Sequence, residues 1–188
     1  MWDASLEGQL SLLAEAARPV GRSGDTWTDR ARRRLPEHLS ALRGTKLYGN
    51  PDRYRRCVND VNRLLARKGR GAGVSITLAD YQDSRLSPLR SEDLLRAARE
   101  HESNPFVSVL AGRMEALVEE HAPDAVGVSL NYLSQALSAF AMIGLARERF
   151  PRVATVLGGG LVTSWLGRTG GRNPFTGLID HCVAGPGE

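Results

Sequence analysis

The chain has 188 residues, 41% of them hydrophobic, and a formal net charge of +4. This length suits one domain with an appendage, and the hydrophobic share suffices for a buried core. No apolar run reaches the roughly 18 residues of a membrane span, and the start of the chain lacks the basic segment of a signal peptide. We therefore expect a cytoplasmic protein with no membrane partner. Two cysteines, Cys57 and Cys182, are too few for a disulfide framework, and we interpret both as small buried groups.

Residues 1–70 are predicted to form a helical N-terminal region with a basic charge. They hold 15 lysines and arginines against 8 acidic residues. Apolar residues at helical spacing predict helices over 1–18, 27–43 and 51–68, the last with Asn50 as its N-cap. No zinc spacing or RNA-binding aromatic motif accompanies the basic residues. We interpret them as a solvated helix face, with a docking surface as the alternative and nucleic acid as the least favoured partner.

Residues 71–188 are predicted to form an α/β domain. Apolar and polar residues alternate over 74–79, which indicates a strand, and further strands are predicted over 124–130, 153–157 and 178–185. Helical patterns separate them, over 91–103, 104–124 and 133–150. Strands that alternate with helices are typical of a Rossmann-like (flavodoxin-like) parallel sheet with helices on both faces.

The carboxyl ends of three predicted strands are rich in small or polar residues. Open α/β sheets bind ligands outside the carboxyl ends of their strands. We therefore expect these ends to meet at one rim and to bind a cofactor. The candidate residues are Ser129, Leu130, Asn131, Tyr132, Ser134, Gln135, Gly158, Gly159, Gly160, Thr163, Gly185, Pro186, Gly187 and Glu188.

The segment "PDAVGVSLNYLSQALSAFAMIGLARERFPRVATVLGGGLVT", followed by "LIDHCVAGPGE", resembles the cobalamin-binding domain of B12-dependent radical SAM enzymes. The shared elements are a strand that ends in a serine-containing loop, a helix that ends in "ERFP", a strand that ends in Gly-Gly, and a closing G-x-G-E turn. The resemblance covers about residues 73–188. It implies a Rossmann-like fold and binding of the cobalamin nucleotide tail beside the sheet.

The resemblance also implies roles for individual residues. Ser129 matches the serine that hydrogen-bonds the tail, and Gly158 and Gly159 match the pair whose missing side chains leave room for it. Asn131 and Tyr132, together with Ser134 and Gln135, would hydrogen-bond phosphate, ribose or corrin amides. The helix that begins near Tyr132 would present backbone N–H groups to the phosphate.

Several family motifs are absent. The cobalt-ligating D-x-H-x-x-G does not occur, so the resemblance implies base-off cobalamin without a histidine ligand. No first strand of the sheet is recognisable near the N-terminus. The C-x-x-x-C-x-x-C motif that holds a 4Fe–4S cluster is also missing. We expect this chain alone not to catalyse methyl transfer. The cluster and S-adenosylmethionine would belong to an adjoining radical SAM domain, in cis or in trans, of a methyltransferase or peptide-maturation enzyme.

Two other functions remain open. A degenerate domain of this family would bind no cofactor and would dock to partner domains through its basic helical region. A Rossmann-like enzyme for another nucleotide is disfavoured, because Asp180, the acidic residue at the ribose-reading distance from the glycines, lies inside the next strand.

Overall fold

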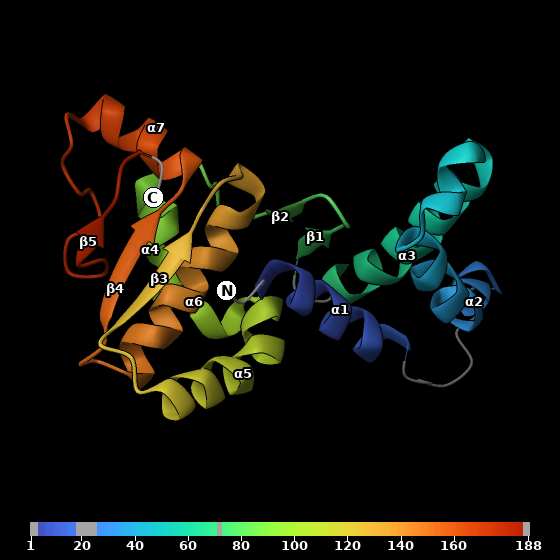
Figure 1. Ribbon diagram of the computed structural model, residues 1–188, viewed down its shortest axis with the longest axis horizontal. Helices are drawn as coiled ribbons and strands as arrows, with labels where there is room; N and C mark the ends of the chain where they lie inside the picture. The colour runs from blue at the N-terminus through green and yellow to red at the C-terminus, as the bar shows by residue number, and fades with distance from the viewer. Residues whose placement is uncertain (1–3, 18–25, 71–72, 186–188) are drawn as a thin grey trace. The chain divides into compact units, whose positions relative to one another are not determined.

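The computed structural model describes residues 4–17, 26–70 and 73–185 (Figure 1). The chain divides into two compact units, Met1–Asp83 and Ser84–Glu188, and each is considered by itself. None of the described helices is both long enough and apolar enough to cross a membrane.

The first unit contains three α-helices, α1 (Ala4–Ala17), α2 (Thr26–Leu42) and α3 (Pro51–Arg70), with a short 3-10 turn, η1 (Thr45–Gly49), before α3. These helices confirm the pattern predicted from apolar spacing. Asn50 precedes α3, and its side-chain oxygen accepts a hydrogen bond from the backbone N–H of Arg53 at 3.0 Å, as expected for an N-cap. One stripe of α3 is buried and forms the core of this unit: Cys57, Val61, Leu64 and Leu65.

The strand predicted over 74–79 exists only in part and does not belong to the parallel sheet. β1 (Val74–Ile76) pairs antiparallel with β2 (Tyr81–Asp83), and both lie within the first unit. The reason is a tight turn. Thr77 and Asp80 exchange hydrogen bonds, from the Thr77 N–H to the Asp80 carbonyl at 2.9 Å and from the Asp80 N–H to the Thr77 hydroxyl at 2.9 Å. A connection this short can join only antiparallel strands.

The second unit is α/β, with a parallel sheet in the order β3-β4-β5. β3 (Ala125–Ser129) pairs with β4 (Ala154–Gly158), so Ser129 lies opposite Gly158. β4 pairs with β5 (His181–Cys182), which is much shorter than the strand predicted there. The remaining elements are helical: α4 (Ser91–Arg99), η2 (His101–Ser103), α5 (Pro105–His121), η3 (Leu133–Gln135), α6 (Ala136–Arg149) and α7 (Gly160–Thr169).

Helix α6 forms the centre of the second unit (Figure 1). Its Phe140, Ala141 and Ile143 are almost completely buried, and it packs against α4 and beside β4. Gly144 faces the backbone of Ala98 in α4 so closely that any side chain at this position would overlap it. Glycine is therefore what allows these two helices to approach each other.

The two faces of β3 differ in exposure. Ala125, Gly127 and Ser129 are exposed, whereas Val126 and Val128 between them are half-buried. The expectation of helices on both faces is therefore wrong at β3, where the described residues leave one face uncovered. Three residues of β4 lie in register with the exposed residues of β3 and are partially exposed: Ala154, Val156 and Gly158. They continue this face.

Candidate functional site

Two of the three predicted loops meet at the carboxyl ends of β3 and β4. The Leu130 N–H donates to the Gly158 carbonyl at 2.7 Å, and the Leu161 N–H donates to the Leu130 carbonyl at 3.2 Å. These bonds extend the strand pairing past Ser129 and bind the serine loop to the glycine loop. We call residues 129–132, 158–160 and 185 the rim.

Asn131 links both loops through its side chain. Its Oδ1 accepts a hydrogen bond from the Gly160 N–H at 3.0 Å, and its Nδ2 donates to the Ser129 Oγ at 3.2 Å. Gly160 is the first residue of α7, so Asn131 satisfies one of the N–H groups that a helix start leaves unpaired. Asn131 therefore holds the rim in shape, and the Ser129 hydroxyl keeps its own proton for another acceptor.

The backbone conformation at position 159 requires glycine. Gly159 has φ of +106°, and a Cβ built on it would lie 2.5 Å from the Leu130 carbonyl oxygen. A bulky residue here would strain the turn and separate the two loops. The sequence resemblance explained Gly159 by the room that its missing side chain leaves for a cofactor, but the backbone requires glycine here whether or not a cofactor binds.

Gly158 and Gly160 are different, because a side chain fits at both positions. A Cβ on Gly158 would lie 3.6 Å from the Cβ of Val183, and one on Gly160 would lie 3.7 Å from the Asn131 Oδ1. Both distances are ordinary van der Waals contacts. Neither has the positive φ that disfavours other residues. The packing of the described residues therefore does not demand glycine at 158, although a side chain there would contact Val183.

Thr163 joins the third loop to the rim. Its hydroxyl donates to the Gly159 carbonyl at 3.0 Å and accepts from the Gly185 N–H at 3.0 Å. The candidates Pro186, Gly187 and Glu188 lie outside the described residues.

The remaining candidates occupy the turn after the serine loop. Tyr132 is 68% exposed, and its backbone N–H donates to the Gln135 Oε1 at 3.3 Å. Ser134 lies in the same 3-10 turn and is half-buried. Leu130 has no exposed surface, so its side chain belongs to the core and only its backbone faces the rim. Tyr132 is thus the one large side chain that the rim presents to solvent.

One carboxylate oxygen of Asp180 accepts three hydrogen bonds just before β5, away from the rim. This atom, Oδ2, accepts from the Thr155 N–H at 2.7 Å, from the Thr155 hydroxyl at 3.1 Å and from Arg147 at 3.0 Å. The Thr155 backbone N–H is the main reason why the pKa of Asp180 lies below its usual value, with help from the Thr155 hydroxyl and Arg147. Sequence reasoning missed this structural role. These bonds leave Asp180 poorly placed to read a ribose.

Comparisons with protein-family models, with curated proteins and with solved structures returned no match.

Proposed function

We propose that residues 84–188 form a Rossmann-like cobalamin-binding module of a B12-dependent radical SAM enzyme. The observation that carries the proposal is the rim. The serine loop, the glycine loop and the start of the closing turn belong to three of the four elements on which the family resemblance rests, and direct hydrogen bonds join them.

The chemistry of the rim fits the nucleotide tail of cobalamin. Ser129 offers a hydroxyl on the exposed face of β3, and Gly158, directly opposite in register, carries no side chain. Tyr132 adds an exposed aromatic ring. A hydroxyl, a glycine backbone that a ligand can approach and an aromatic face are groups that suit a flat heterocycle on a ribose-phosphate linker. Cobalamin, when bound, supplies the cobalt chemistry, and the role of this chain is to hold and orient it.

Base-off binding without a histidine ligand also agrees with the described residues. The nearest histidine in the sheet is His181, which pairs with Val156 and so lies two residues before the rim. We infer that no imidazole of the described rim coordinates the cobalt. The methyl-transfer reaction itself would need the separate radical SAM domain.

The test is direct binding. The purified chain is mixed with hydroxocobalamin or methylcobalamin, desalted, and examined by absorption spectroscopy, with a heat-unfolded sample as the control. The proposal predicts co-elution of about one equivalent and a base-off spectrum. Absence of both co-elution and spectral change would contradict it.

A second candidate is a docking module that binds no cofactor. The observation in its favour is the uncovered face of β3, where Ala125, Gly127 and Ser129 are exposed. It predicts a chain free of cobalamin that nevertheless binds a radical SAM protein in a pull-down. Cobalamin retention by the isolated chain would exclude this candidate.

A further inference from the structure

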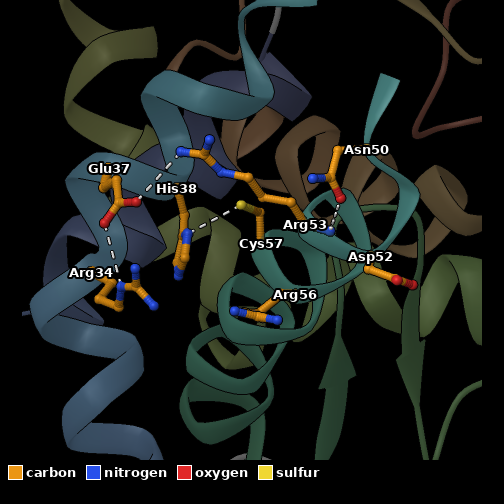
Figure 2. A pocket seen from close by; sticks show the side chains of 8 residues that line it. All are labelled: Arg34, Glu37, His38, Asn50, Asp52, Arg53, Arg56 and Cys57. Atoms are coloured by element: carbon orange, nitrogen blue, oxygen red, sulfur yellow. Dashed lines mark hydrogen bonds and ion pairs between the residues drawn. The ribbon is translucent and has the colours of Figure 1, made fainter. Parts of the chain in front are cut away.

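The helical unit contains a chain of hydrogen bonds between a thiol, an imidazole and a carboxylate. The Cys57 Sγ lies 3.1 Å from the His38 Nδ1, and the His38 Nε2 lies 2.9 Å from the Asp60 Oδ2 (Figure 2 shows the first contact). Cys57 and Asp60 are three residues apart on α3 and share a face, whereas His38 comes from α2. Both nitrogens of one ring are thus used.

The arrangement fixes which ring nitrogen carries a proton. His38 is only 3% exposed, so water does not compete for its ring. An ionised carboxylate can only accept, so Asp60 holds the proton on Nε2 and leaves Nδ1 to accept from the Cys57 thiol. This is the order of groups in which a histidine serves as general base for a nucleophile.

The thiol is neutral at rest. Burial is the main cause that raises the pKa of Cys57, and the carboxylates of Glu37 and Asp60 also raise it, while Arg53 and Arg34 act in the opposite direction. Activation therefore requires transfer of the proton to a base within contact distance, and His38 is that base.

Cys57 and His38 line a cavity of about 500 Å³ that also carries three arginines and two carboxylates, Glu37 and Asp52 (Figure 2). Arg34 and Arg53 both contact Glu37, at 3.3 Å and 3.6 Å, so one carboxylate is shared between two guanidinium groups. Arg56 makes no ion pair among the described residues. Cys57 is only 2% exposed, but it is one of the residues that line this cavity.

We propose that Cys57 is a nucleophilic thiol, with His38 as its base, for a small organic anion that carries an electrophilic carbon. The anionic group would bind the arginines, above all Arg56. The thiol proton moves to the His38 Nδ1 as sulfur bonds to the carbon, and the leaving group departs with the electron pair of its broken bond. Asp60 stabilises the imidazolium. This site lies in the helical unit and does not depend on the cobalamin proposal.

The experiment compares iodoacetate with iodoacetamide on the full chain, because the two reagents differ in one negative charge. Peptide mass spectrometry reports the alkylation rates of Cys57 and Cys182 separately. Among the described residues, the Cys182 thiol has no hydrogen bond to a histidine, and it gives the reference ratio of the two reagents. We expect the iodoacetate-to-iodoacetamide ratio at Cys57 to exceed that at Cys182 by about fivefold or more, from attraction by the arginines. Equal ratios, or a Cys57 that reacts only after unfolding, would overturn the proposal.

Substitution of His38 tests whether this residue acts as a base or only packs against the Cys57 thiol. His38→Gln should slow alkylation of Cys57 by about tenfold or more while the rate at Cys182 is unchanged. If His38 only shields the thiol, its replacement would instead speed the reaction, which contradicts the proposal. Arg56→Gln should lower the iodoacetate-to-iodoacetamide ratio at Cys57 and leave the ratio at Cys182 as it is. Circular dichroism of each variant confirms that it is folded.

Discussion

Two adjacent glycines of the rim should respond oppositely to the same substitution. Gly159→Ala places a Cβ 2.5 Å from the Leu130 carbonyl oxygen, at a residue with φ of +106°. A backbone with this φ and with ψ of 173° is adopted almost only by glycine and alone costs about 1–3 kcal/mol for another residue, and relief of the overlap brings the total to about 3 kcal/mol or more. Gly160→Ala meets only ordinary contacts at the first residue of α7. It should be neutral or stabilise by up to about 1 kcal/mol, because alanine favours helix.

The assay is urea-induced unfolding of the second unit, followed by hydrogen exchange in peptides from β4 and α7. Wild type and the two variants are compared at neutral pH. We expect the Gly159→Ala midpoint to fall and the Gly160→Ala midpoint to stay or rise. Equal midpoints for the two variants would contradict the claim that the backbone requires glycine at position 159. The remaining role for Gly159 would then be to leave room for a ligand.

Three further substitutions test the second unit. Gly144→Ala should prevent close packing against Ala98 and either destabilise the protein by more than about 3 kcal/mol or abolish folding, measured by thermal unfolding. Asn131→Ala removes the bond to the Gly160 N–H and should cost about 1 kcal/mol in urea titrations. Asp180 has a lowered pKa, so its stabilising contribution is present above about pH 4 and is lost as pH falls through the native pKa. Asp180→Asn should therefore weaken the loss of stability between pH 7 and pH 3, and an unchanged pH profile would contradict this role.

The parallel part of the sheet was predictable because its signals are local and sequential. A strand, an apolar helix and a second strand in residues 123–160 require a parallel crossover, and that crossover places Ser129 opposite Gly158. The meeting of the serine and glycine loops follows from this register. Asn131 was recognised as a polar rim residue, but its bond to Gly160 depends on loop conformation that no spacing rule specifies.

The errors have equally specific causes. Alternation over 74–79 indicates a strand but does not identify its partner, and the turn between Thr77 and Asp80 selected an antiparallel neighbour. The triple glycine indicated a close approach, but the group that approaches Gly159 is the Leu130 backbone, which the sequence pattern does not identify.

The contacts among Cys57, His38 and Asp60 could not be predicted from the sequence for a related reason. His38 and Cys57 lie 19 residues apart on different helices. Their contact results from the packing of α2 against α3, which apolar spacing predicts only as a pair of buried faces. No short motif joins them to Asp60, so a sequence pattern could not single out this set.

The central claim is that cobalamin binds against the rim at Gly158, and a binding titration with hydroxocobalamin tests it most directly. Gly158→Val adds a side chain at a position where a Cβ makes only ordinary contacts, and Gly127→Val adds the same side chain to the neighbouring strand, short of the rim. We predict binding of about one equivalent by wild type, affinity within about twofold for Gly127→Val, and a loss of about tenfold, or ~1.4 kcal/mol, for Gly158→Val. A wild-type chain that binds no cobalamin, or a Gly158→Val chain that binds it as tightly as wild type, would contradict the account.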